Sequence, residues 1–283
     1  MTSATPPPTR SDPLHLQVAR NVRNKIEAGA LRDGEALPST REMADQWDVS
    51  VYTINEAMKV LAREGLIVAK DRANRTVHYP QGNRHEQARP DRPRAVLIGG
   101  FPGSGKTELG RILARLTGWP ILDKDTLTRP VVEAALEILG RSPHDRESDA
   151  YLEKIRPREY ESLMSAALEN LECGNSVILT APFIREFRDD AWITRTEAQM
   201  QALGAVTSFA WIYCDESTMH TYMRHRGAAR DASKLADWNA YLASIDLNLR
   251  PPVPHFLLDN SASSTPLQSQ AKDMVKKLLK GTD

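Results

Sequence analysis

The sequence predicts two folded units: three helices with a β-hairpin, followed by an α/β unit built around a mainly parallel five-stranded sheet. The 283 residues exceed the roughly 100–200 that one domain usually holds. Hydrophobic spacing changes along the chain from helical to alternating strand and helix, and residues 81–94 contain almost no apolar side chain. We therefore expect a mobile tail at 1–13, a first domain at 14–80, a linker at 81–94 and a second domain at 95–283.

Composition places the chain among globular proteins, with 41% hydrophobic and 26% charged residues. No apolar run approaches the roughly 20 residues of a membrane span, and the start has no hydrophobic leader, so we predict a cytoplasmic protein. Cys173 and Cys214 lack metal-site spacing and are expected to be buried thiols. Residues 1–94 hold 15 basic and 12 acidic residues, a small excess with the sign that suits nucleic-acid phosphates.

Apolar residues at three- and four-residue spacing predict three helices in the first domain. The first covers 14–29, the second follows Pro38 and the third follows Ser50, where a serine can cap the helix. Residues 66–69 and 76–79 can pair as a hairpin around a polar tip. Three helices and a hairpin make a winged helix, which places its third helix in the major groove of duplex DNA.

The winged helix resembles the GntR family over residues 14–79, most clearly in Ile26-Glu-Ala-Gly-Ala-Leu-Arg-Asp-Gly-Glu-Ala-Leu-Pro-Ser-Thr-Arg-Glu-Met-Ala and in the segment from Val49 to Leu66. The resemblance implies that Arg41, at the start of the second helix, contacts DNA. The sequence departs from the family at Val51, where members usually carry arginine, and in the wing, where Ala73 and Asn74 replace glycines.

Outward positions of the third helix supply the other predicted DNA contacts. Asn55 can recognise adenine, Tyr52 can stack on the backbone, and Ser50 and Thr53 can donate to phosphate. The predicted DNA-binding set is Arg41, Ser50, Tyr52, Thr53, Asn55, Lys59, Arg72 and Arg75, with Lys70 beside the wing arginines. The alternative is a winged helix retained for protein contacts or dimerisation.

A phosphate-binding motif opens the second domain. Gly100-Phe-Pro-Gly-Ser-Gly-Lys106-Thr107 fits GxxxxGK[ST] between an apolar strand and a helix. Backbone N–H groups of such a loop bind phosphate, Lys106 would bridge the terminal phosphates of ATP, and Thr107 would hold Mg²⁺. The alternative is a glycine-rich turn that matches by chance. The predicted nucleotide-binding residues of the loop are Gly100, Gly103, Ser104, Gly105, Lys106 and Thr107.

Alternating strands and helices predict that the second domain has a P-loop NTPase fold. Strands are expected at 95–98, 120–122, 176–179, 207–213 and 255–258. Long helices are expected at 108–117, 129–139, 149–172, 191–203 and 266–280. The third strand ends Leu179-Thr-Ala-Pro without an acidic residue, which disfavours hydrolysis of the motor or GTPase type.

The phosphate loop, Ile121-Leu-Asp-Lys-Asp-Thr126, and residues 176–183 followed by Arg185 and Arg188 together resemble P-loop kinases of the polynucleotide kinase, chloramphenicol phosphotransferase and zeta-toxin type. The resemblance covers about 95–260 and implies phosphoryl transfer from ATP to a hydroxyl group. Asp125 matches the acceptor-activating aspartate of these kinases, although it could instead cap the following helix. Asp123 could approach magnesium or be a loop charge.

These kinases close an arginine-bearing lid on the triphosphate, and residues 223–231 look like that lid. Arg226 is the main candidate, with Arg224 and Arg230 assisting. The alternative is a solvated helix face. Asn260, after the last strand, has the place of a loop that contacts the base.

Three hypotheses follow for the whole chain. It could be a transcription regulator whose second domain senses a nucleotide or metabolite, or a working kinase for a small hydroxyl compound with the winged helix controlling genes. Both can hold together, since a mere sensor would not need Asp125 and Arg226. A nucleic-acid 5′-kinase is the third. The predicted partners are an operator DNA, ATP, a small acceptor or effector, and a second copy in a homodimer.

Overall fold

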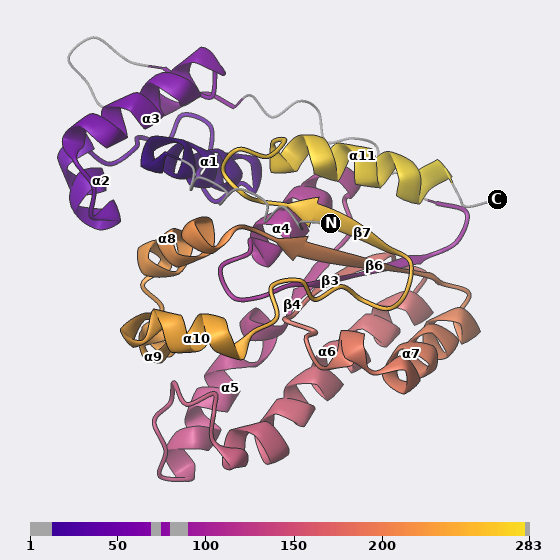
Figure 1. The fold of residues 1–283 in the computed structure, drawn as a ribbon. Helices are drawn as coiled ribbons and strands as arrows, with labels where there is room; N and C mark the ends of the chain where they lie inside the picture. The colour runs from indigo at the N-terminus through magenta and orange to yellow at the C-terminus, as the bar shows by residue number, and fades with distance from the viewer. Residues whose placement is uncertain (1–12, 69–74, 80–89, 281–283) are drawn as a thin grey trace, which may run out of the picture.

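The computed structural model describes residues 13–68, 75–79 and 90–280, without the side chain of Arg230. Figure 1 shows the N-terminal helices gathered at one end of an α/β unit whose central sheet has helices on both sides. The expected tail, the wing tip with Lys70 and Arg72, and most of the expected linker lie outside the described residues.

The N-terminal unit is the predicted winged helix. Its elements are α1 (Leu14–Glu27), α2 (Thr40–Trp47), α3 (Val51–Arg63), β1 (Ile67–Val68) and β2 (Thr76–Val77), with β1 and β2 antiparallel. Ser39 caps α2 in a capping box with Glu42, and Ser50 caps α3 by accepting from the backbone N–H of Thr53. The apolar stripes predicted for α2 and α3 are buried in one core.

The C-terminal unit contains a five-stranded sheet in the order β4-β5-β3-β6-β7, with every neighbouring pair parallel. The strands are β3 (Arg94–Gly99), β4 (Ile121–Asp123), β5 (Val177–Thr180), β6 (Val206–Tyr213) and β7 (His255–Asp259). Helices α4 (Lys106–Thr117) and α11 (Leu267–Lys280) cover one face. Helices α6 (Arg156–Glu172) and α7 (Asp190–Ala202) cover the other (Figure 1).

Two helix boundaries differ from the sequence prediction for physical reasons. Helix α5 (Lys124–Ile138) begins five residues before the expected 129, because the side chain of Asp123 caps it at Thr126. The single helix expected at 149–172 is a π-helical segment, η1 (Ala150–Ile155), followed by α6. Pro157 lies at the start of α6 and has no N–H, so it cannot continue the regular hydrogen-bond ladder from the preceding turn.

Between β6 and β7 the chain forms helices that the sequence analysis did not predict. They are α8 (Glu216–Arg226), η3 (Ala229–Asp231), α9 (Ala232–Ala236) and α10 (Trp238–Ser244), and η2 (Glu186–Arg188) is a further short turn after β5. The expectation of two buried thiols is wrong for Cys173, which is exposed at the end of α6, whereas Cys214 is buried. None of the helices in the described ranges is long and apolar enough to cross a bilayer.

Candidate functional site

The phosphate loop connects β3 to α4 at the carboxyl edge of the sheet. Gly103 and Gly105 have φ angles of +78° and +99°, which side chains rarely tolerate. A Cβ at Gly105 would also lie 2.2 Å from Nδ2 of Asn260. Glycine is therefore required where the sequence motif places it, and α4 begins at Lys106 with its N-terminus at the loop.

Lys106 and Thr107 have different partners at the end of this loop. The Lys106 ammonium donates to the carbonyl of Phe101 at 2.9 Å, so it lies across the loop. The Thr107 hydroxyl donates to Oδ2 of Asp123 at 3.1 Å, and the Thr180 hydroxyl donates to the same oxygen at 2.6 Å. Three chain segments thus bring two hydroxyls and a carboxylate together beside the predicted phosphate position.

These oxygens suit Mg²⁺, which prefers one or two carboxylates completed by substrate phosphates and water. Asp123, expected to approach magnesium or to be a loop charge, caps α5 with its Oδ1 while its Oδ2 accepts from Thr107. The cap that the sequence offered to Asp125 is thus made by Asp123, and Asp125 lies in the first turn of the helix. In the described part of the chain, no group of three or more His, Cys, Asp or Glu residues could hold a metal. A magnesium ion here would therefore take its remaining ligands from the nucleotide and solvent.

Asp125 lies in the first turn of α5 beside a buried charged network. Its carboxylate is 3.0 Å from the Lys124 ammonium, which also contacts Oε1 of Glu159 at 2.6 Å. The hydroxyl of Tyr151 donates to Oε2 of Glu159 at 2.6 Å, and burial raises the pKa of Tyr151, so this hydroxyl keeps its proton. Lys124 and Glu159 are only 5% and 3% exposed, against 38% for Asp125. Of these three charged groups, the Asp125 carboxylate is thus the accessible one, and the buried Lys124 ammonium lies next to it.

The sequence analysis missed Lys124, Tyr151 and Glu159. A lysine between Asp123 and Asp125 is visible in the sequence, but its buried partner lies 35 residues away on another helix. No local pattern indicates that pairing.

The lid arginines are directed to carboxylates. Arg226 donates through Nε to Asp231 at 3.0 Å and makes a second, short hydrogen bond to the same carboxylate. Arg224 pairs with Asp48, the residue that ends α2, at 2.5 Å. Arg230 lies in η3, and its side chain is outside the described set. The structure thus pairs Arg226 with a carboxylate of the same predicted lid segment and Arg224 with the winged helix.

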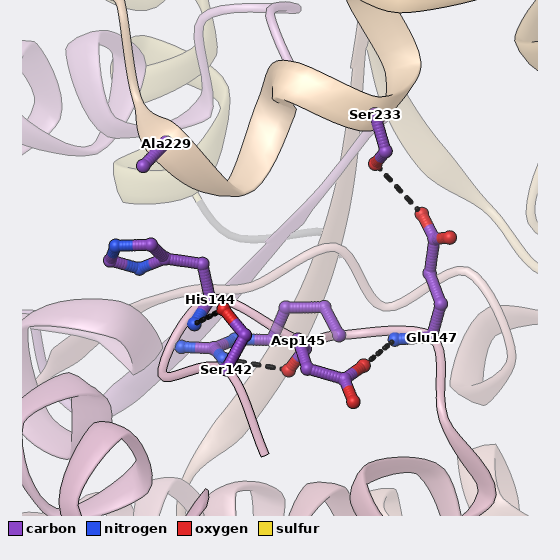
Figure 2. Close-up of a pocket in the computed structure, with 7 residues that line it drawn as sticks. Ser142, His144, Asp145, Glu147, Ala229 and Ser233 are labelled. Atoms are coloured by element: carbon purple, nitrogen blue, oxygen red, sulfur yellow. Dashed lines mark hydrogen bonds between the residues drawn. The ribbon is translucent and has the colours of Figure 1, made fainter. Parts of the chain in front are cut away.

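A polar pocket of about 250 Å³ lies between the lid and the loop before η1 (Figure 2). Ala229 and Ser233 face it from the lid side, while His144 and Glu147 face it from the loop. The Ser233 hydroxyl donates to Glu147 at 3.3 Å, which joins the two walls. The guanidinium of Arg146, another lining residue, lies 5.2 Å from the ring centre of Tyr151, so the pocket borders the network around Asp125.

Several of the predicted DNA-binding residues are exposed on the winged helix. Tyr52 is 73% exposed, Arg41 is exposed, and Lys59 is exposed while pairing with Glu56. Ser50 and Thr53 bond each other at the start of α3.

Asn55 and Arg75 are engaged with each other inside the unit. Arg75 donates to Oδ1 of Asn55 at 3.1 Å and to the Thr40 hydroxyl at 3.0 Å. It therefore ties the second strand of the hairpin to both helices of the helix-turn-helix.

Asn260 follows the last strand as expected, but its side chain does not have the expected role. Its side chain is fully buried, and Nδ2 donates to the carbonyl of Ser104 at 3.1 Å. It is therefore hydrogen-bonded to the phosphate loop and is not placed to contact a base. Ser104 itself is fully buried, so its hydroxyl is not exposed to a nucleotide in this structure.

Comparison with known proteins gives two family matches. The profile described as an AAA domain matches residues 96–247, and the one described as bacterial regulatory proteins, gntR family, matches residues 14–77. Shikimate kinase of Moorella thermoacetica is 28% identical over 116 residues, which are 40% of this chain and 65% of that protein. The HTH-type transcriptional regulator GgaR of Escherichia coli K12 is 34% identical over 55 residues, which are 19% of this chain and 22% of that protein.

The chain thus spans less than two thirds of either curated relative. Among solved structures, the APS kinase CysC of Mycobacterium tuberculosis is 19% identical with a TM-score of 0.45, over 68% of this chain and all of that one. The AAA-domain match covers more than half of the sequence and includes the phosphate loop described above. The chain belongs to this family of P-loop proteins, with a kinase-like P-loop unit that follows a GntR-type helix-turn-helix domain.

Proposed function

We propose that the protein is a DNA-binding transcription regulator whose P-loop unit binds Mg²⁺-ATP and phosphorylates a small hydroxyl-bearing metabolite. The observation that carries this proposal is the meeting of the Thr107 hydroxyl with the Asp123 carboxylate, two residues before the accessible Asp125. A metal-binding pair and a candidate base then share one edge of the sheet, as phosphoryl transfer requires.

Each residue of the site has a separate role in this proposal. The loop backbone and Lys106 hold the β- and γ-phosphates, and Thr107 with Asp123 hold Mg²⁺, which neutralises phosphate charge when bound. Asp125 accepts the proton of the attacking hydroxyl, and Lys124 keeps its carboxylate in place. Arg226 contacts the triphosphate only after leaving Asp231, so lid closure exchanges one anionic partner for another.

The acceptor is a small polar compound in this proposal. The pocket of Figure 2 is lined mainly by hydroxyl, carboxylate, imidazole and guanidinium groups, which suit a hydroxylated molecule better than an apolar one. Asp125 is not among the lining residues, and a chain of contacts through Arg146, Tyr151, Glu159 and Lys124 connects it to the pocket.

Turnover is tested by ADP release from the full chain with Mg²⁺-ATP and a metabolite pool. We expect metabolite-dependent release that is lost in Lys106→Ala and in Asp125→Asn. Asp273→Asn is the matched control, since it removes an exposed carboxylate on α11. Retained turnover in Asp125→Asn would refute its role as base. Absence of turnover in the unmodified protein, with ATP binding lost only in Lys106→Ala, would leave ATP as a sensed ligand.

In this proposal the winged helix binds operator DNA, and the protein acts as a homodimer in the cytoplasm. Arg41 and Tyr52 are exposed on its outer side, available to phosphate and base. Sedimentation with and without duplex DNA tests the assembly: two chains per operator are expected, and a strictly monomeric species on DNA would contradict the dimer.

An enzyme with an accessory DNA-binding unit is the second candidate. The match to a shikimate kinase over 65% of that protein favours it. A kinase whose turnover is indifferent to operator DNA would support this candidate over the regulator.

A further inference from the structure

Helix α1 is buried on its polar side as well as its apolar side. Val18, Val22 and Ile26 face the winged-helix core. The polar residues between them are buried too, and they are Gln17, Arg20, Asn21, Arg23, Asn24 and Glu27. Neighbouring helices of the P-loop unit, α4, α8 and α11, contact α1. The polar face of α1 is therefore an interface between the two units.

Arg20 is the centre of this interface and is only 1% exposed. Its Nε donates to Oδ1 of Asn260 at 3.1 Å, and its two Nη atoms donate to the carbonyls of Asp259, Ser264 and Thr265 at 2.7–3.0 Å. A guanidinium from the DNA-binding unit thus holds the loop that follows β7.

Asn260 carries this contact into the nucleotide site. Its Oδ1 accepts from both Arg20 and Asn24, which leaves Nδ2 directed at the carbonyl of Ser104. An asparagine amide could otherwise turn over and exchange its donor for its acceptor. The two donors of α1 therefore fix the orientation of the amide that holds the phosphate loop.

Helix α8 makes a second connection between the winged helix and the phosphate loop. Beside the loop, a Cβ at Gly103 would lie 2.9 Å from the Met223 side chain, so α8 packs directly on the glycine. On its other side, Tyr222 belongs to the winged-helix core and His225 stacks on Trp47 at 3.6 Å between ring centres. The phosphate loop thus rests on elements that the winged helix holds at two places.

We propose that Arg20 is a positioning residue for the nucleotide site, which acts through Asn260, so that ATP binding and docking of the winged helix strengthen each other. The proposal rests on the ATP binding proposed above. Because α1 also packs on the recognition helix α3 and pairs Arg23 with Glu64, any DNA-induced shift of α3 reaches Arg20 through one rigid helix pair. Thermodynamic linkage then requires ATP and DNA to change each other's affinity by the same factor.

The direct test is hydrogen exchange of the phosphate-loop amides in the full-length protein without nucleotide. Arg20→Gln should exchange the amides of residue 101 and of residues 103–105 several-fold faster than the unmodified chain, because Asn260 loses a fixed orientation. Asp273→Asn is the matched control: it removes an exposed carboxylate on α11 that pairs with Lys276 rather than with α8 or the loop, and should leave that exchange unchanged. Equal exchange in Arg20→Gln and the unmodified chain would overturn the proposal.

The coupled readout is the dissociation constant for Mg²⁺-ATP. We expect Arg20→Gln to raise it by about 5- to 150-fold, the range typical of coupling between sites, and Asp273→Asn to change it by less than about twofold. Asn260→Asp keeps an acceptor for Arg20 but replaces the donor to Ser104 with a carboxylate oxygen that the carbonyl repels, so it should weaken ATP binding. Hydrogen exchange of the winged-helix core, measured in the same experiment and expected to be unchanged, reports that the fold is kept. This variant separates positioning from folding.

Failure of the proposed function and failure of the positioning role of Arg20 give different results in these experiments. If the unmodified chain does not bind ATP, the proposed function fails, while faster loop exchange in Arg20→Gln would still establish the positioning contact. If the chain binds ATP and Arg20→Gln binds it equally well with unchanged loop exchange, the proposed function stands and the positioning role of Arg20 is refuted.

Discussion

Two titratable side chains in the interface should give the stability of this protein opposite dependences on pH. The Nε2 of His225 lies 2.9 Å from the Lys25 ammonium, and its ring stacks on Trp47. Burial, with a smaller effect of Lys25, lowers the pKa of His225 from 6.5 to about 4. On the same helix as Lys25, burial raises the pKa of Glu27 from 4.5 to about 7, against the pull of the nearby Arg23 and Arg20.

The signs follow from which form the fold prefers. Neutral His225 is preferred, so its contribution to the free energy of unfolding is complete above pH 6.5 and is lost as the pH falls towards 4. Neutral Glu27 is also preferred, so its contribution is complete below pH 4.5 and is lost as the pH rises towards 7. Each shift corresponds to about 3 kcal/mol, or about 1.4 kcal/mol per pH unit within its window. Between pH 4.5 and 6.5 the two effects nearly cancel.

Single substitutions should separate these effects. His225→Phe keeps the stack on Trp47 but removes the titration, so its stability relative to the unmodified chain should rise by about 1.4 kcal/mol for each pH unit from 6.5 down to 4.5. Glu27→Gln should show the reverse, gaining relative stability as the pH rises from 4.5 to 7. Urea unfolding at pH 5, 6 and 7 measures both differences, and NMR titration of the histidine rings measures the pKa of His225 directly. Differences that do not change with pH, or a ring that titrates near 6.5, would refute the reasoning.

Three further outcomes test the sites separately. Lys106→Ala should abolish ATP binding in calorimetry while leaving the melting temperature nearly unchanged, and ATP binding in that variant would contradict the phosphate-loop assignment. Asp123→Asn should remove the dependence of ATP affinity on Mg²⁺ while still capping α5, since asparagine is an equally good cap; an unchanged Mg²⁺ dependence would exclude Asp123 from the metal site. Arg41→Ala should weaken binding to every duplex similarly and reduce the slope of log affinity against log salt by about one, and an unaltered slope would mean that Arg41 does not contact phosphate.

The parts of this protein that sequence reasoning could predict depend on local patterns. The apolar spacing of α3 and the capping serine at residue 50 are local features of the sequence, and both lie where expected. The phosphate loop was predictable because its glycines are needed locally: Gly103 and Gly105 have positive φ angles that other residues rarely adopt. All five strands of the sheet were expected to within one or two residues.

Contacts made across the chain could not be predicted in the same way. Arg20 and Asn260 are 240 residues apart, and neither lies in a pattern that indicates a partner. Helical periodicity shows which face of α1 is apolar, but it cannot show that the polar face is also covered. The helices from α8 to α10 have little apolar periodicity because they pack on two sides or on loops, and their existence follows from tertiary contacts.

The chemistry of the interface suits a contact that opens and closes. In the described residues, Asn21 Oδ1, Glu27 Oε2 and the hydroxyl of Tyr222 are buried there without a hydrogen-bond partner. Each such group costs about 1–3 kcal/mol that contact with water would return. The hydrogen bonds of Arg20 and Asn24 offset this cost. The net free energy of docking is therefore a small difference between a stabilising and a destabilising contribution. A nucleotide or a DNA duplex need supply only a few kcal/mol of differential binding to shift such an equilibrium, which is within the reach of either ligand.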